Sequence, residues 1–163
     1  MRWLLICLLA FPAAAQDVVF DPEMTEQCLG IVAEDEQRSC IGRSASDCMK
    51  ETEGGESTVG MGGCLEAELT YWDDRLNAEY ARLQAETERR DAELAELENT
   101  GPRIAPTLRE MQRQWIAFRD ATCDFERAQW GGGTGGGPAT LACLMRLTGE
   151  QALYLSTQRL GNE

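Results

Sequence analysis

Histidine is absent from this chain of 163 residues, so the side chain that most often serves as a general base or a zinc ligand is missing. No C-x-x-C pair and no D-x-D/N-x-D/N-G calcium loop occurs, and no Ser-His-Asp or Cys-His arrangement can form. Paired carboxylates could still cleave a glycosidic bond, but 28 acidic residues form many pairs by chance. We therefore predict a protein that is not an enzyme and carries no metal and no cofactor.

Long apolar runs are missing beyond the first residues. Residues 3–11 form an apolar run of nine residues, and residues 12–15 supply the small side chains that precede a signal-peptidase cut. The run is too short for a membrane span, which needs about 20 residues in a helix. The sequence predicts a signal peptide over residues 1–15, cleaved after Ala15. It also predicts a mature protein that is exported to the bacterial periplasm, or secreted, without membrane insertion.

Basic side chains are scarce, and Lys50 is the only lysine. The 28 acidic residues outnumber the 15 basic ones, which gives a net charge of −13, or −14 once Arg2 leaves with the signal peptide. A surface of this charge disfavours nucleic acids and anionic lipid head groups, and it attracts basic proteins, peptides or cations. Simple solubility explains the same charge equally well.

Seven cysteines are present, and Cys7 lies inside the predicted signal peptide. An even number of cysteines in an exported chain predicts disulfides rather than free thiols. We expect three disulfides, although six cysteines allow 15 connectivities. The six are Cys28, Cys40, Cys48, Cys64, Cys123 and Cys143.

Apolar side chains recur at spacings of three and four, which is typical of helices with one buried face. The pattern predicts a helix from about residue 64 to 98 and a second from residue 106 or 107 to the glycines near 131. A last helix is expected from residue 139 or 140, whereas residues 51–63 are expected to form turns. The buried positions should be Leu65, Leu69, Trp72, Leu76, Tyr80 and Leu83, then Leu108, Met111, Trp115, Phe118, Thr122 and Phe125.

No segment alternates with the period of two that marks a half-buried strand. We therefore predict an all-α fold in one domain, residues 16–163. Two long antiparallel helices and a third C-terminal helix would form a core over residues 64–160. Residues 16–63 would form a cysteine-rich cap of one or two short helices.

Polar residues flank the apolar stripes of the two long helices. Arg119, next to a buried seam, requires a carboxylate, and Asp73 or Asp74 is the expected partner. The favoured interpretation is an interhelical hydrogen-bond network that fixes helix register; the alternative is a polar groove that accepts a ligand. The residues of this polar seam are Asp73, Asp74, Asn77, Tyr80 and Gln84 on the first helix and Gln112, Trp115, Arg119 and Asp120 on the second.

A glycine-rich segment separates the second and last helices, between Cys123 and Cys143. A phosphate-binding loop is not indicated, because no strand precedes the glycines and no Lys-Ser/Thr follows them. The segment is expected to be a plain connector, with insertion into the cleft of a protein partner as the alternative. Its residues are Gly131, Gly132, Gly133, Thr134, Gly135, Gly136 and Gly137.

Two segments together resemble the LprI-like lysozyme-inhibitor domain family. The first runs from Ser57 to Cys64 and continues over Trp72 to Tyr80; the second runs from Leu108 to Cys123, with Cys143 and Thr148 beyond it. The resemblance extends from about residue 48 to 155. It implies a helical envelope domain, inhibition of lysozyme as reported for one member, and the pairings Cys48–Cys64 and Cys123–Cys143. Cys28 and Cys40 are left to pair with each other, outside the family's usual pattern.

The resulting functional hypothesis is a periplasmic binding protein that inhibits a basic lysozyme. The alternatives are a structural or assembly module of the envelope and, from a different class, a hydrolase of cell-wall glycans. The glycine segment and the acidic residues 86–98 are the exposed candidates for contact with the partner, and the sequence does not choose between them. The sequence does not indicate an oligomeric state.

Overall fold

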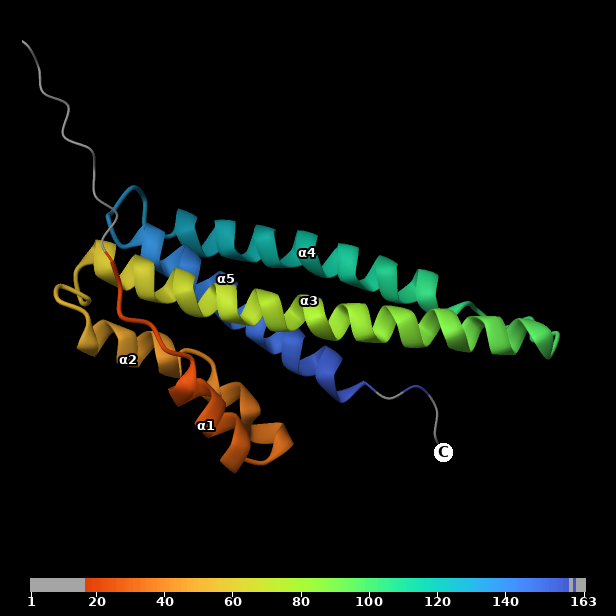
Figure 1. Ribbon diagram of the computed structural model, residues 1–163. Coiled ribbons are helices and arrows are strands. Elements are labelled where there is room, and N and C mark those ends of the chain that lie inside the picture. The colour runs from red at the N-terminus through yellow and green to blue at the C-terminus, as the bar shows by residue number, and fades with distance from the viewer. Residues whose placement is uncertain (1–16, 159, 161–163) are drawn as a thin grey trace, which may run out of the picture.

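The computed structural model describes residues 17–158 and 160, and the predicted signal peptide with its cut after Ala15 lies outside these residues. The described part is helical and contains no strand, as the all-α prediction requires (Figure 1). The elements are α1 (Glu23–Ile31), the 3-10 helix η1 (Glu34–Cys40), α2 (Arg43–Glu51), α3 (Thr58–Glu96), α4 (Ile104–Ala128) and α5 (Gly136–Thr157). None of these helices is long and apolar enough to span a membrane.

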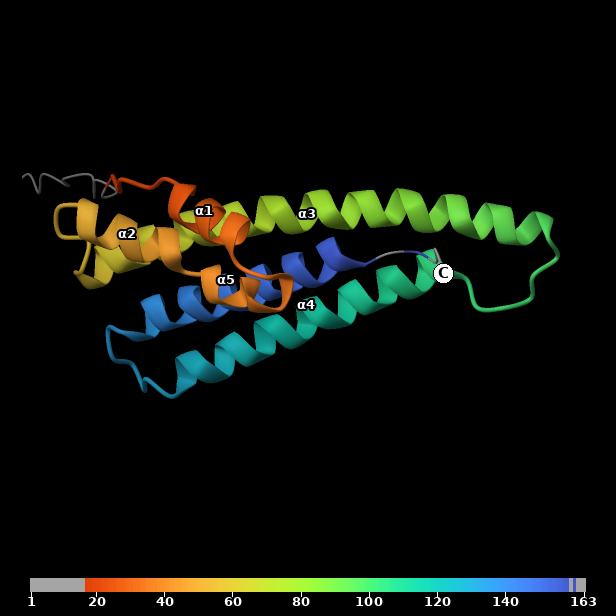
Figure 2. The same ribbon diagram turned by 90° about the horizontal axis from the view of Figure 1, so that it is seen from below.

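The three long helices form a bundle. α4 runs antiparallel to α3, and α5 turns back again to lie between them, parallel to α3 (Figures 1 and 2). α3 has 39 residues and extends well beyond the end of α5, so the far ends of α3 and α4 form a two-helix extension. The two expected antiparallel helices are therefore present, but α3 packs mainly on α5 and much less on α4.

The core lies between α3 and α5, because α5 is apolar on most of its sides. Trp72 and Leu155 are completely buried there. Gly149 of α5 permits this approach, since an added Cβ would lie 3.1 Å from the Trp72 ring and 2.9 Å from Ile41. The expected burial of α4 is partly wrong: Phe118 and Phe125 are 60% and 66% exposed, because α5 presents its apolar surface chiefly to α3.

Three helix starts differ from expectation, and one of them is α4, which begins at Ile104, two residues before the earliest expected position. α3 begins at Thr58, inside the segment expected to form turns, because the Ser57 hydroxyl accepts a hydrogen bond from the Gly60 N–H at 3.1 Å and caps the helix. Gly60 is needed there for packing, since an added Cβ would lie 2.3 Å from the Gly54 carbonyl oxygen. α5 begins at Gly136, so the last glycines belong to a helix.

Residues 17–57 form a cap of three short helices, one more than the largest number expected. Three disulfides tie the elements together: Cys28–Cys40 joins α1 to η1, Cys48–Cys64 joins α2 to α3, and Cys123–Cys143 joins α4 to α5. These are the pairings that the family resemblance implies, with the N-terminal pair added.

Glu68 of α3 holds the cap against the bundle and was not singled out by the sequence. Its carboxylate is completely buried, and its Oε1 accepts hydrogen bonds from the Thr25 hydroxyl at 3.1 Å and the Gly42 N–H at 2.7 Å. The Trp72 indole N–H also donates to Oε1 at 2.9 Å, and the Ala45 N–H donates to Oε2 at 2.6 Å. One side chain thus joins α1, the turn before α2, α2 itself and the core tryptophan.

Asp91 performs the corresponding task at the other end of the bundle. Its carboxylate accepts hydrogen bonds from the Ile104 N–H at 2.8 Å and the Ala105 N–H at 3.0 Å, the first two residues of α4. The residue before α4, Arg103, supplies no side-chain cap of its own. A residue of α3 therefore caps α4 and fixes the turn between the two helices.

Candidate protein-binding surface

The predicted polar seam is mostly not assembled. The pairing of Arg119 with Asp73 or Asp74 is wrong: Arg119 bonds to its neighbour Asp120 at 2.9 Å and lies over the Trp115 ring at 5.0 Å. Asp73 instead accepts a hydrogen bond from Asn77 on its own helix at 3.0 Å. The separation follows from α5, which lies between α3 and α4 and takes most of the surface of α3.

The remaining seam residues differ in their partners. Gln112 does bridge two helices, but to α5, since it accepts a hydrogen bond from the Gln151 amide at 3.0 Å in a buried position. Tyr80 packs partly buried against the core, whereas Asp74 is exposed. Trp115, expected at the centre of the seam, is only half-buried and lines a groove described below.

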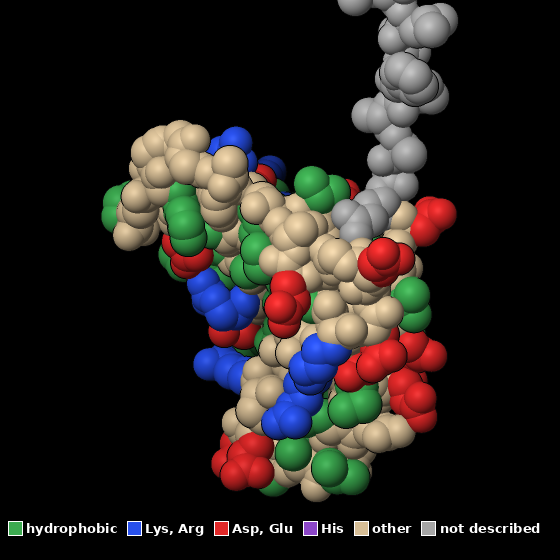
Figure 3. All heavy atoms as spheres, turned by 90° about the vertical axis from the view of Figure 1, so that its left-hand side faces the viewer, with side chains coloured by type: hydrophobic (Ala, Val, Ile, Leu, Met, Phe, Trp, Pro, Cys, Tyr) green, Lys and Arg blue, Asp and Glu red, His purple; other side chains and the backbone are tan. Residues whose placement is uncertain are grey.

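The glycine segment is a short connector at the end of the α4–α5 hairpin. Its first four residues are exposed, and Trp130 lies against Gly135, where an added Cβ would come within 2.3 Å of the indole ring. At this end of the molecule, acidic and basic side chains are scattered among exposed backbone and uncharged residues (Figure 3). Gly131 and Gly132 line only a shallow hollow with three residues of α4, so the segment offers few side chains to a partner.

The acidic stretch over residues 86–98 is largely neutralised by arginine. Glu93 pairs with Arg89 at 2.6 Å and Arg90 at 3.3 Å, and these hydrogen bonds lower its pKa. Glu86 pairs with Arg82 at 3.1 Å, and Glu88 pairs with Arg109 of α4 at 3.3 Å. The stretch therefore presents less unpaired negative charge than its composition indicates.

The cap carries a larger excess of acidic residues. Residues 17–57 contain eleven acidic and three basic residues, a net charge of −8. Glu34 and Asp35, at the start of η1, form no ion pair with another described residue. Both are exposed, so their charges face solvent or a partner.

Three hollows meet at Tyr154 of α5, which is 48% exposed. One lies between η1 and α5, with a volume of about 530 Å³, and we call it the η1 hollow. A second, of about 300 Å³ between α4 and α5, we call the aromatic groove. A third, of about 370 Å³, lies beyond the end of α5 between α3 and α4 and is lined by apolar residues such as Leu83, Ile104 and Leu108.

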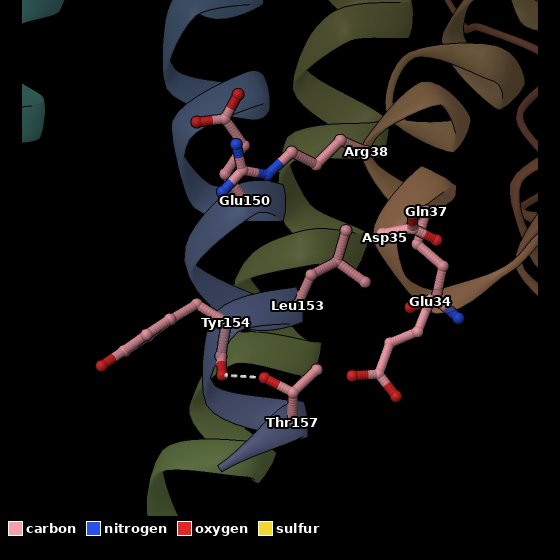
Figure 4. A pocket seen from close by; sticks show the side chains of 8 residues that line it. All are labelled: Glu34, Asp35, Gln37, Arg38, Glu150, Leu153, Tyr154 and Thr157. Atoms are coloured by element: carbon pink, nitrogen blue, oxygen red, sulfur yellow. Dashed lines mark hydrogen bonds between the residues drawn. The ribbon is translucent and has the colours of Figure 1, made fainter.

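Figure 4 shows how the η1 hollow is built. Leu153 lies between the two elements, the Glu34 carboxylate points toward Thr157, and Arg38 extends across α5 toward Glu150. The Thr157 hydroxyl donates to the Tyr154 backbone carbonyl at 2.9 Å, and the Tyr154 ring points away from the other lining residues. Carboxylates from two elements thus line a hollow with a single guanidinium.

The aromatic groove has the composition of a protein-interface centre. Aromatic and methionine side chains are enriched at such centres, and a polar rim surrounds them. The lining residues are Met111, Trp115 and Phe118 of α4, Leu147, Gln151 and Tyr154 of α5, and Arg38 and Glu150 at the rim. Tyr154 carries no signal in the sequence, because an aromatic residue in an apolar helix is equally compatible with burial in the core.

The sequence model of the family described as lysozyme inhibitor LprI matches residues 48–155. The chain belongs to the LprI lysozyme-inhibitor family. The LprI match covers α3 and α4 completely and α5 up to Leu155, so the aromatic groove lies within it except for Arg38. The LprI match leaves out α1 and η1, together with the Cys28–Cys40 disulfide and the acidic side of the η1 hollow.

A relative of this LprI-family chain shares 27% identity with it over 159 residues, which is 96% of this chain and 95% of the relative. It is described as an uncharacterized 17.7 kDa protein in the puhA 5′ region of Rhodobacter capsulatus. No solved structure matches the chain. Among residues 17–158 and 160, no group of three or more carboxylate or thiol side chains is placed to hold a metal ion.

Proposed function

We propose that this LprI-family protein is exported to the periplasm, or secreted, and acts there as a non-enzymatic inhibitor that binds a basic lysozyme. The observation that carries the proposal is the position of the aromatic groove inside the span that matches the family. A shallow aromatic surface with a polar rim suits a protein partner better than a small substrate, which requires an enclosed pocket.

The charge distribution supports a basic partner. The cap contributes −8 to the total charge, whereas α4 contains four arginines and four acidic residues and is neutral overall. A negative surface beside a nearly neutral apolar one would accelerate encounter with a cationic protein while short-range contacts form at the groove. Lysozymes with an excess of basic residues fit this distribution.

A lysis assay tests the proposal. Purified mature protein is added to a basic lysozyme and a suspension of bacterial cell walls, and the fall in turbidity is followed. Inhibition that saturates with protein concentration is the expected result. Lysis by the protein alone would instead identify a glycan hydrolase, and the absence of any effect on several basic lysozymes would favour an envelope module.

A further inference from the structure

Exposed aromatic side chains gather on one face of the bundle. Phe118 of α4 is 60% exposed and Tyr154 of α5 is 48% exposed, and both line the aromatic groove beside the half-buried Trp115. Large apolar side chains that remain exposed next to one another on a folded domain are typical of an interaction site. The groove lacks an occupant from the described part of the chain.

The η1 hollow opens beside this groove, because Arg38, Glu150 and Tyr154 line both. Three carboxylates, those of Glu34, Asp35 and Glu150, and one guanidinium line the hollow. Glu150 has a distant partner in Arg146 at 3.9 Å, whereas Glu34 and Asp35 form no ion pair within the described residues. An apolar groove and an excess of negative charge are therefore adjacent on the same face.

We propose that the aromatic groove and the η1 hollow together form the docking surface for a cationic protein segment. An apolar side chain of the segment enters the groove between Phe118 and Tyr154, and an arginine or lysine next to it lies against Glu34 and Asp35. The identification of that segment as part of a lysozyme rests on the proposed function. Its chemistry, a basic residue beside an apolar one, follows from this face alone.

Charge complementarity selects this occupant over two others. A second copy of the chain carries the same strongly negative net charge and is repelled. An acidic peptide would be repelled by Glu34 and Asp35. Among the lining residues, Arg38 alone carries a positive charge that would attract it. The glycine segment, the other exposed candidate, offers mainly backbone and lacks the side chains that usually dominate a protein interface.

The first test removes the apolar anchors from the complete mature chain. The probes are hen egg-white lysozyme, which is basic, and a short synthetic peptide of alternating arginine and tryptophan. Phe118→Ala and Tyr154→Ala are each expected to weaken binding about tenfold or more, as hot-spot truncations do. Phe125→Ala is the matched control, because it is 66% exposed on the same helix but does not line the groove.

The second test changes the charges. Glu34→Gln combined with Asp35→Asn should weaken binding about threefold to tenfold at physiological salt. Glu96→Gln combined with Glu98→Gln makes the same change in charge near the far end of α3 and should leave the affinity unchanged. Arg38→Gln should raise the affinity for both cationic probes, since the Arg38 guanidinium repels a cation at this surface.

The outcomes separate this inference from the proposed function. If lysozyme is inhibited but the groove variants inhibit as well as Phe125→Ala does, the docking surface is wrong and the function stands. If only the peptide binds, and binds through the groove, the surface stands and the lysozyme assignment falls. If neither probe binds, both the docking surface and the proposed function are wrong. Weaker binding by Arg38→Gln, or self-association that Tyr154→Ala abolishes, would assign the face to an anionic partner or to a second copy.

Discussion

Glu68 is a buried carboxylate surrounded by donors, and its replacement should loosen the cap. In Glu68→Gln the new amide group faces the Ala45 N–H, which now donates to Oε2 at 2.6 Å, so one buried donor loses its acceptor. Leaving a buried donor unpaired costs about 1–3 kcal/mol of unfolding free energy. Urea denaturation followed by circular dichroism measures the loss.

Glu66→Gln is the control for Glu68, because Glu66 lies on the same helix but is exposed. It should change the unfolding free energy by less than about 0.5 kcal/mol. Equal effects of the two substitutions would mean that the cap does not depend on the buried carboxylate.

Asp91 makes the stability of the helical hairpin depend on pH. The Ile104 N–H is the main cause that lowers its pKa below the ordinary value of 3.8; the Ala105 N–H and the charges of Arg103 and Arg109 add to it, and partial burial opposes it. A pKa that is lower in the folded state stabilises the protein above the unfolded value, and this stabilisation is lost as the pH falls through the folded value.

We therefore expect Asp91→Asn to reduce the urea midpoint at neutral pH, and the difference from the wild type to shrink as the pH falls below about 4. Urea titrations between pH 2 and 7 measure this. Glu96→Gln, an exposed acid at the end of the same helix, should show no such pH-dependent difference. A constant difference at all pH values would contradict the capping role.

Individual residues differ in how far the sequence could place them. The six cysteines could be predicted to pair because their number is even in an exported chain, and Trp72 could be placed in the core by helical spacing. Glu68 occupies a helical position next to that same stripe, but its donors come from Thr25, Gly42 and Ala45, far away in the sequence. Periodicity carries no information about contacts of that kind.

At the scale of elements, periodicity predicted the existence of the long helices but not which pair packs most closely. Apolar residues recur on α4 at regular helical spacing, yet Phe118 and Phe125 are exposed. The spacing alone does not show whether another helix packs against that face. α5 is apolar on several sides and is therefore the helix that α3 covers. The groove at Tyr154 follows from this choice of partner and could not be found from either helix alone.

Two glycines at the α4–α5 connection should respond to alanine in opposite directions. Gly132 has φ +110°, which an alanine adopts only with strain, so Gly132→Ala should cost more than about 1 kcal/mol. Gly137 lies in the first turn of α5 with nothing within 4 Å of an added Cβ, so Gly137→Ala should gain about 0.4–1 kcal/mol. Thermal and urea unfolding measure both, and a loss in both variants would place the start of α5 after Gly137.

For the whole molecule, the distribution of charge matters more than its total. The cap holds eleven acidic residues with few bases near them in the sequence, whereas Glu86, Glu88 and Glu93 of the stretch 86–98 each pair with an arginine. At physiological ionic strength the Debye length is about 8 Å, so only charges near a docking surface influence encounter. Composition gives the net charge, but the ion pairs that cancel it locally depend on helical spacing and on which helices meet.

Two triple substitutions with the same change in charge separate these regions. The first replaces Glu26, Glu36 and Glu51 of the cap with glutamine, and the second replaces Glu93, Glu96 and Glu98 at the far end of the bundle. If a cationic lysozyme approaches the face that includes η1, the cap variant should associate about threefold more slowly or worse at physiological salt. The second variant should associate at nearly the wild-type rate.

Stopped-flow measurements at several salt concentrations test this and contain their own control. At low salt, where the Debye length reaches about 30 Å, both variants should associate more slowly, because the total charge is then felt over the whole molecule. As salt rises, the second variant should recover the wild-type rate first, since its charges lie farther from the docking surface. Dissociation rates should change little in either, because the substituted residues lie outside the groove and all but the half-buried Glu93 are exposed. A second variant that stays as slow as the cap variant at physiological salt would move the approach to the far ends of α3 and α4 and away from Tyr154.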